Sequence, residues 1–235
     1  MHFSAWRRSS CSENRKAART VSHLLHKAVE WGWISHAPVK VRLLQDEARR
    51  IDYLTAEECQ RLLDAAKADS NPQIYPFTLI GLRTAMRRME ILRIRREHVD
   101  LAPRTIFIPK AKAGVRKQPI TGPLAEFLEG YLAALPAETP WLFPSATSAA
   151  GHTTDVRKAF RRAVMAAGLD PDRILRHTLR HTAITHMVLA LVNLPTVKIF
   201  SGHKTLAMVE RYAHANTAYV QASLDKLEAQ YEKKG

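Results

Sequence analysis

The chain has 235 residues, and its 36 Lys and Arg side chains outnumber its 22 Asp and Glu side chains, which gives a formal net charge of +14. Hydrophobic residues make up 46% of the sequence, a fraction that excludes a largely disordered chain. The length suits either one full domain with a smaller second piece or two small domains. The strongly positive field favours a polyanionic partner, most commonly nucleic acid.

The sequence carries no signal for export or membrane insertion. The longest notable apolar run, residues 187–192, is far shorter than the ~20 residues that a membrane-spanning helix needs. No apolar segment follows Arg7 and Arg8 in the manner of a signal peptide. Cys11 and Cys59 form neither a CxxC motif nor the spacing of a metal site. We therefore expect a soluble, cytoplasmic protein with reduced cysteines.

Hydrophobic periodicity predicts a mostly helical chain with one small β-hairpin, an α+β protein. Apolar residues recur at helical spacing over residues 14–31, and the charged residues 38–51 are interpreted as a linker. Thr55 and Glu58 form the capping box of the next helix, so the main domain begins near residue 52. Within it we predict a hairpin of strands 105–109 and 117–120, and helices over residues 58–67, 75–84, 87–96, 124–135, 154–167, 178–190, 194–200, 205–212 and 217–232.

Four basic or aromatic clusters stand out in the main domain, at residues 84–92, 109–117, 177–182 and 201–214. Arg87 and Glu90 in the first cluster lie three residues apart and so share a helix face, as do His177 and Arg180 in the third. Taken singly, such clusters are more often surface salt bridges, solvated turns and core residues than functional sites.

In combination and in this order, the clusters closely resemble the catalytic domain of the tyrosine recombinase (phage integrase) family, over about residues 52–215. The HxLRHT element at residues 177–182 and the GHKTLAMVERYAH element at residues 202–214 carry most of the resemblance. It implies the catalytic-domain fold of that family, with Tyr212 as nucleophile and Glu90 supporting the first arginine. The other catalytic positions that it implies are Arg87, Arg180, His177, His203 and Lys112 at the hairpin turn, with Lys110 as the alternative register.

The residue types independently suit phosphodiester transfer. Two arginines can hold non-bridging oxygens with forked hydrogen bonds, nearby cations favour a phenolate, and lysine or histidine can move protons. The intermediate would be a 3′-phosphotyrosine that stores the bond energy, and the sequence shows neither a Walker-type loop nor an acidic pair for Mg²⁺. We expect no metal, no ATP and no cofactor, double-stranded DNA as partner, and DNA contacts by Arg88, Lys110, Arg116, Lys117 and Lys204.

Several positions depart from the family pattern without removing a reactive group. Ala85 and Met89 stand where glycines are usual. Residues 190–193 replace a helix-ending Ala-Gly-x-(Asp/Asn) pattern. We therefore expect Leu191 or Asn193 to take the turn at an energetic cost.

The two ends of the chain raise separate expectations. Residues 1–37 look like the remnant of the helical core-binding domain that normally precedes the catalytic domain, here residues 52–216, so we expect weaker and less specific DNA binding. Residues 217–235 form a C-terminal helix and tail with an apolar stripe. That stripe packs on its own domain or on a neighbouring protomer, as in the tetrameric assemblies of the family on DNA. A monomer in solution is compatible with both packings.

Two other functions stay open. A DNA-binding module that has lost recombination through truncation would follow from the short N-terminal region. A metal-dependent hydrolase would use His177 and His181, which lie four apart on one helix face. Zinc requires a third ligand, however, and Arg176 and Arg180 flank the pair.

Overall fold

The computed structural model describes residues 11–39, 41, 51–110, 114–214 and 217–232. The chain divides into two compact units, Met1–Arg49 and Arg50–Gly235. The first unit contains α1 (Cys11–Glu30), which is followed by a turn with Gly32 in the left-handed region. In that turn the rings of Trp31 and Trp33 lie 4.9 Å apart.

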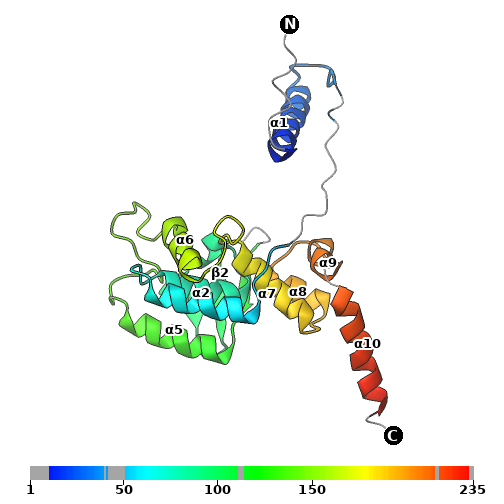
Figure 1. Cartoon of the computed structure of the whole chain (residues 1–235). Helices are drawn as coiled ribbons and strands as arrows, with labels where there is room; N and C mark the ends of the chain where they lie inside the picture. Colours follow the sequence, from blue (N-terminus) through cyan, green and yellow to red (C-terminus); the bar gives the residue numbers. More distant parts are fainter. Residues whose placement is uncertain (1–10, 40, 42–50, 111–113, 215–216, 233–235) are drawn as a thin grey trace. The chain divides into compact units, whose positions relative to one another are not determined.

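The second unit is mostly helical with one small sheet, which confirms the predicted α+β class (Figure 1). Its longer helices lie close to the predicted ranges. The described elements are α2 (Ala56–Ala68), α3 (Ile74–Thr84), α4 (Arg88–Leu92), a 3-10 turn (Arg96–His98), β1 (Val99–Asp100), β2 (Thr105–Ile108), β3 (Arg116–Pro119), α5 (Gly122–Ala134), α6 (Arg157–Ala166), α7 (Thr178–Leu189), α8 (Leu194–Ser201), α9 (Ala207–His214) and α10 (Thr217–Glu232).

The start of α2 shows the predicted capping box. The Thr55 hydroxyl accepts a hydrogen bond from the backbone N–H of Glu58 at 3.2 Å, and the Glu58 carboxylate accepts one from the backbone N–H of Thr55 at 2.9 Å. These reciprocal bonds satisfy two backbone donors that the first turn of a helix otherwise leaves unpaired.

The predicted hairpin is part of a three-stranded antiparallel sheet with the order β1-β2-β3. Ile106 pairs with Val99 on one side and with Gln118 on the other. Ile106 and Ile108 are buried while Phe107 is exposed, because successive side chains of a strand point to opposite faces. The short β1 was not predicted, since two residues leave no readable alternation.

The helix predicted over residues 87–96 is wrong in its second half, because α4 ends at Leu92. The chain that follows pairs with the loop before residue 143 instead of continuing the helix. The carbonyl of Ile94 accepts from the N–H of Leu142, and the N–H of Arg96 donates to the carbonyl of Pro140, both at 2.9 Å. Helical periodicity in the sequence cannot reveal such a distant backbone pairing.

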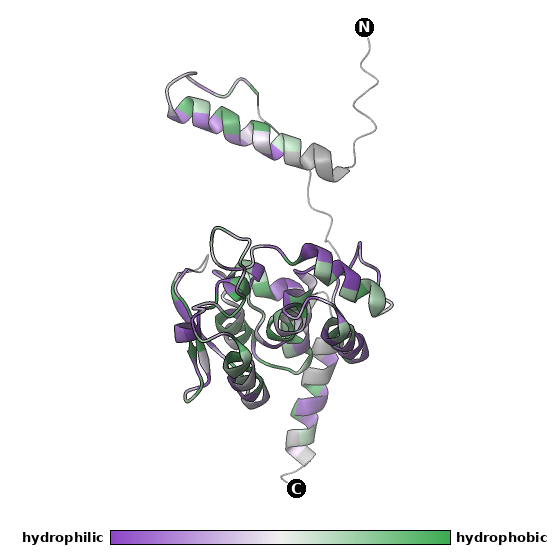
Figure 2. Cartoon of the chain, turned by 90° about the vertical axis from the view of Figure 1, so that its left-hand side faces the viewer, coloured by the Kyte–Doolittle hydropathy of each residue, from purple (hydrophilic) through white to green (hydrophobic). Residues whose placement is uncertain are grey.

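Buried side chains form two hydrophobic cores in this unit, and Figure 2 shows hydrophobic residues concentrated towards its interior. The larger core lies among α2, α3, α5, α6 and the sheet, and includes Phe77 and Phe160 with their rings 6.4 Å apart. The smaller core joins the C-terminal end of α3 to α7, α8 and α9, and consists of Ala85, Ala183, Ile184, Val188, Val197, Val209 and Tyr212.

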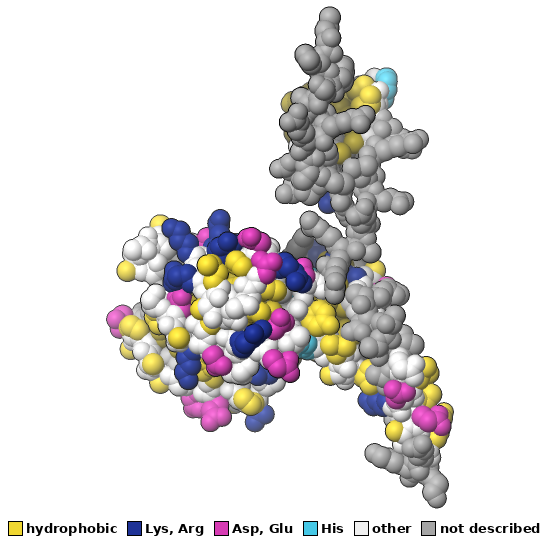
Figure 3. Space-filling model, in the orientation of Figure 1, with side chains coloured by type: hydrophobic (Ala, Val, Ile, Leu, Met, Phe, Trp, Pro, Cys, Tyr) yellow, Lys and Arg dark blue, Asp and Glu magenta, His cyan; other side chains and the backbone are white. Residues whose placement is uncertain are grey.

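The surface over α2, α5 and α6 carries acidic and basic side chains interspersed with each other (Figure 3). Such a face lacks the uniform positive charge that a nucleic-acid surface presents. None of the described helices is long and apolar enough to cross a membrane.

Candidate active site

Arg87 is placed by the sharp turn between α3 and α4. Ala85 there adopts a left-handed conformation (φ 53°), and Arg87 itself is extended as the N-cap of α4. Its guanidinium Nη1 donates to Glu90 Oε1 at 2.8 Å, and Nη2 donates to the carbonyl of Gly202 at 3.3 Å. The first arginine of the predicted site is therefore tied to the loop that precedes α9.

Glu90 is buried and pairs with a second arginine. Its Oε2 lies 3.0 Å from Arg116 Nη2 and accepts from the backbone N–H of Arg87 at 3.1 Å. Burial alone would raise the pKa of Glu90, but the hydrogen bonds from Arg87 and the charge of Arg116 outweigh it and hold the pKa below its ordinary value. The carboxylate therefore stays ionised and fixes both guanidinium groups.

Gly202 allows the loop before α9 to approach this ion-pair network. Its φ of 64° suits glycine, and a Cβ atom built on it would lie 2.8 Å from Arg116 Nε. Arg116 also donates to the carbonyl of Phe200 at 3.1 Å, at the end of α8. Residue 202 thus requires glycine for two reasons: its backbone conformation and the space that Arg116 occupies.

Arg180 lies on α7 with an exposed fraction of only 2%. Its Nη1 donates to the carbonyl of Ala85 at 2.5 Å, and its Nη2 lies 3.1 Å from His203 Nε2. Burial, and then the positive charge of Arg87, lower the pKa of Arg180 to about 10, so this arginine still carries its charge at neutral pH. Arg180 and His203, two of the predicted catalytic residues, are therefore in direct contact in the structure.

The hydrogen bonds of His203 define which of its nitrogens carries the proton. Arginine only donates, so Nε2 accepts from Arg180, and the Nδ1–H donates to the Ser201 hydroxyl at 2.7 Å. Ser201 in turn donates to the carbonyl of Val197 at 2.6 Å. Burial and the charges of Arg180 and Arg87 lower the pKa of His203 to about 4, so the ring is neutral at pH 7.

Tyr212 lies on α9, and its buried side chain packs in the smaller core. Its hydroxyl forms a 2.7 Å hydrogen bond with Nδ1 of His181 on α7, and its ring centre lies 6.3 Å from that of His203. Burial raises the pKa of Tyr212, whereas Arg180 and Arg211 act in the opposite direction. The phenol oxygen is thus within electrostatic reach of the buried arginine.

His177 lies immediately before α7 and reaches solvent. Its ring meets that of His181 edge to face, with ring centres 4.6 Å apart. Partial desolvation, and then the charges of Arg180, Arg87 and Arg211, lower its pKa. His177 therefore belongs to the cluster, but the hydrogen bond to Tyr212 comes from its neighbour one turn further along α7.

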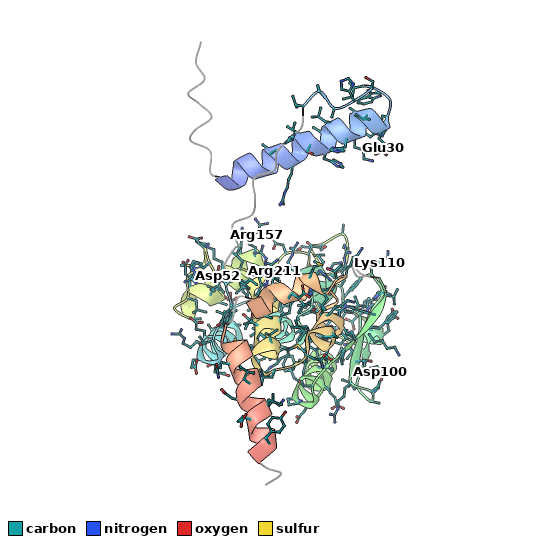
Figure 4. All side chains as sticks on the ribbon, turned by 90° about the vertical axis from the view of Figure 1, so that its right-hand side faces the viewer. Glu30, Asp52, Asp100, Lys110, Arg157 and Arg211 are labelled. Atoms are coloured by element: carbon teal, nitrogen blue, oxygen red, sulfur yellow. The ribbon has the colours of Figure 1, made fainter. Side chains whose placement is uncertain are left out.

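The side chains that were expected to contact DNA differ in their exposure and in their hydrogen-bond partners. Lys110, Lys117 and Lys204 are exposed, and Figure 4 shows Lys110 and Arg211 in the upper half of the unit and Asp100 in its lower half. Arg88 donates to the carbonyl of Thr154 at 3.1 Å. Lys112, the predicted catalytic lysine, lies outside the described residues.

Arg116, which was expected among the DNA contacts, has a largely buried side chain. Its side chain is 13% exposed and is directed at Glu90, Gln118 and the carbonyl of Phe200. The physical reason is that β3 begins at Arg116, and the alternation of this strand turns residues 116 and 118 to the same, inner side of the sheet.

Three residues of the cluster were not predicted in these roles. His181 entered the sequence analysis only as a possible metal ligand, although its spacing of four from His177 placed it on the same helix face. Ser201 and Arg211 were not predicted as site residues, although they belong to the fourth cluster and lie two residues before His203 and directly before Tyr212. Over the described ranges, no group of three or more His, Cys, Asp or Glu side chains is placed to hold a metal ion.

The fold and this cluster of arginines, histidines and a tyrosine define the tyrosine-recombinase class. Residues 52–218 match the model of the phage integrase family, so the chain belongs to that family. It is 30% identical over 207 residues to a shufflon-specific DNA recombinase of Escherichia coli, a match that covers 87% of this chain and 51% of the relative. A tyrosine recombinase of Pseudothermotoga lettingae is 32% identical over 170 residues, covering 71% and 57% of the two chains.

Solved structures agree with this membership. The catalytic domain of bacteriophage HP1 integrase superposes with a TM-score of 0.57 at 25% identity, over 74% of this chain and 94% of that domain. The integrase of transposon Tn1549, solved in complex with a circular intermediate DNA, has the same fold with a TM-score of 0.75 at 20% identity, over 94% and 81% of the two chains. The chain spans between half and three-fifths of the length of the two relatives above.

Proposed function

We propose that the chain is a site-specific DNA recombinase that breaks and rejoins DNA through a 3′-phosphotyrosine on Tyr212. The observation that carries this proposal is the meeting of Arg87, Arg180, His203 and Tyr212 in one polar cluster, although they come from four separate segments. The E. coli relative is described as a DNA recombinase, which supports the substrate class.

The reaction follows from the chemistry of these groups. Arg87 and Arg180 hold the two non-bridging oxygens of a phosphodiester, and their hydrogen bonds strengthen as negative charge develops in the transition state. The Tyr212 oxygen attacks phosphorus and loses its proton, while the bond to the 5′-oxygen breaks. The leaving oxygen takes a proton from Lys112, or from Lys110 in the alternative register.

The proposed intermediate keeps the energy of the broken bond as a phosphotyrosine ester. Attack by a 5′-hydroxyl then releases the tyrosine and reseals the strand without ATP. The arginines neutralise the phosphate and side chains move the protons, so the scheme assigns no step to a metal ion or another cofactor.

A covalent-capture experiment tests this function. The protein is incubated with a pool of nicked duplexes carrying a randomised segment, so that a cleaved strand leaves and the adduct accumulates. Adducts that survive denaturant are isolated and their DNA is sequenced, which also yields the target. We expect an adduct with the native chain, none with Tyr212→Phe, and full yield with Tyr75→Phe, a tyrosine that packs on Phe127 in the larger core.

The alternative, a DNA-binding module without activity, predicts a different result. Such a protein would shift the pooled DNA in a gel in a salt-dependent manner, because phosphate contacts release counterions. It would give no adduct with any duplex of the pool. That outcome would contradict the proposed recombinase.

We also propose that copies of the chain associate on DNA through α10. Leu224, Leu227 and Tyr231 are exposed on that helix, with exposed fractions of 54%, 44% and 63%. A groove of about 450 Å³ on the same unit offers an apolar surface of matching character, lined by Leu82, Pro119, Ile120, Ala183, Met187 and Phe200. We propose that α10 of a second copy occupies this groove.

Cross-linking on the captured target DNA tests the association. We expect multimers with the native chain and fewer with the double variant Leu224→Ser and Leu227→Ser, since burial of these side chains drives docking. Gln221→Ser on the same helix is the control, because Gln221 is exposed and polar. Monomers alone on target DNA would contradict the proposed association.

A further inference from the structure

The hydroxyl of Tyr212, the nucleophile of the proposed reaction, has one side-chain hydrogen-bond partner among the described residues. The hydroxyl of Tyr212 lies 2.7 Å from Nδ1 of His181, and the two ring centres are 5.7 Å apart. The two residues are separated by 31 positions and lie on α9 and α7, so the contact depends on how these helices pack. The family resemblance assigned no role to His181.

The other two histidines are less suited to receive the proton of Tyr212. Both ring nitrogens of His203 already have partners, because Nε2 accepts from Arg180 and Nδ1 donates to Ser201. No hydrogen bond joins His177 to Tyr212 in the described part of the chain, and the ring of His177 instead packs edge to face on His181. A base must first lie within hydrogen-bond reach of the proton that it removes.

His181 has an unprotonated ring nitrogen at neutral pH. Burial lowers its pKa to about 4, and His177, Arg211 and Arg180 act in the same direction while Asp52 opposes them. The ring is therefore neutral, and one nitrogen of a neutral imidazole is an acceptor. With the phenol donating to Nδ1, the ring hydrogen is on Nε2.

We propose that His181 is the catalytic residue that accepts the phenolic proton of Tyr212 during strand cleavage. This inference rests on the proposed function. The lone pair of Nδ1 takes the proton as the Tyr212 oxygen forms its bond to phosphorus and the bond to the 5′-oxygen breaks. In resealing, the imidazolium returns the same proton to the tyrosine oxygen as the ester bond to the enzyme breaks.

A weakly basic imidazole suffices for this step. The acidity of the tyrosine oxygen changes from that of a phenol to that of an ester oxygen, which binds protons far more weakly than imidazole. Proton transfer thus becomes favourable as the bond to phosphorus forms. The charge that builds on the phosphoryl group then stabilises the nearby imidazolium.

The test measures rates of covalent adduct formation on the captured nicked duplex. We expect His181→Ala to react about 10²–10⁴-fold more slowly than the native chain, the usual range for general base catalysis. His181→Asn retains an acceptor oxygen but no comparable base, so we expect a similar loss. His186→Ala is the matched control and should keep the native rate, because His186 also lies on α7 but bonds to the carbonyl of Leu54.

A second measurement separates proton transfer from a structural effect. Tyr212 is replaced by difluorotyrosine, whose more acidic phenol needs less help from a base. We expect the rate loss caused by His181→Ala to shrink at least tenfold in this background, whereas a merely displaced nucleophile would stay equally impaired. Circular dichroism and the salt-dependent affinity for the duplex verify that each variant is folded and binds.

The outcomes distinguish this inference from the proposed function. An adduct that requires Tyr212 but forms at the native rate in both His181 variants would overturn the inference alone. An equal loss with tyrosine and difluorotyrosine would also overturn it, since His181 would then only position the phenol. The absence of any adduct from the native chain would overturn the proposed function, and this step with it.

Discussion

Arg116 illustrates how the setting of one side chain differs from that of its neighbours in sequence. It follows Lys110 and Lys112 in the sequence, yet its guanidinium lies against Glu90 and beside Gly202. The predicted return strand began one residue too late, at 117, and so missed the alternation that turns Arg116 inward. Because Arg87 and Arg116 both pair with the buried Glu90 carboxylate, a substitution of Arg116 will also change the surroundings of Arg87.

We expect Arg116→Met to lower the free energy of unfolding by about 2 kcal/mol, because the buried Glu90 carboxylate then loses one of its two guanidinium partners and keeps only Arg87. Glu90→Gln in the same chain removes the carboxylate that Arg116 had paired, so the double variant should lose less than the sum of the two single losses. Urea denaturation of the native chain, both single variants and the double variant measures this coupling. Strictly additive losses would show that the two side chains do not act as a pair.

At the scale of elements, most of the fold was predictable because its signals are local. The capping box at Thr55 and the alternation of Ile106 and Ile108 depend on neighbours in sequence, and both were found. The end of α4 and the two-residue β1 were not, because backbone pairing with distant segments defines them. The sequence predicted that either Leu191 or Asn193 forms the turn after α7. In the structure Leu191 forms this turn, with its backbone in the left-handed region.

Leu191 has a φ of 57°, a conformation that costs a side-chain-bearing residue about 1–2 kcal/mol. Asn193 instead caps α8 by accepting from the N–H of Thr196 at 2.9 Å. We expect Leu191→Gly to raise the free energy of unfolding by about 1 kcal/mol, since glycine adopts this turn without strain. Thermal and urea denaturation measure the change.

The control is Leu189→Gly, two residues earlier at the last residue of α7. This substitution should lower the stability by about 0.5–1 kcal/mol, because the backbone of Leu189 is not left-handed and glycine has a lower helix propensity than leucine. Equal destabilisation by both substitutions would contradict the assignment of the strain to Leu191.

At the scale of the whole molecule, the candidate site shows where sequence reasoning stops. The order of the clusters was enough to name Arg87, Arg180, His203 and Tyr212, and the structure brings these together. The contact of His181 with Tyr212 and the chain from Arg180 through His203 to Ser201 depend on the packing of α7, α8 and α9. The contacts of His181 with Tyr212 and of Arg180 with His203 join residues from different segments of the chain, so the spacing of residues within one helix does not predict them.

The buried histidines make the stability of the whole unit depend on pH. His181 and His203 have pKa values of about 4 in the folded chain, against 6.5 ordinarily. Between these values the unfolded chain binds protons that the folded chain does not, so folding stability is complete above pH ~6.5 and is lost as the pH falls towards ~4. The lowered pKa of Glu90 adds a loss of the same sign below its ordinary value of 4.5.

Urea denaturation at several pH values between ~7 and ~5 measures this dependence. The double variant His181→Gln and His203→Gln should show a clearly shallower decline, because glutamine does not titrate. An unchanged slope in that variant would show that other groups control acid stability.

Tyr212 belongs to the smaller of the two hydrophobic cores, which consists of Ala85 and a few side chains of α7, α8 and α9. Regions held by few apolar contacts open at lower free energy than the rest of a protein. We therefore expect α9, which carries Tyr212, to separate from α7 at a lower free energy than that needed to open the larger core. The Tyr212 hydroxyl could then leave His181 while the larger core stays folded.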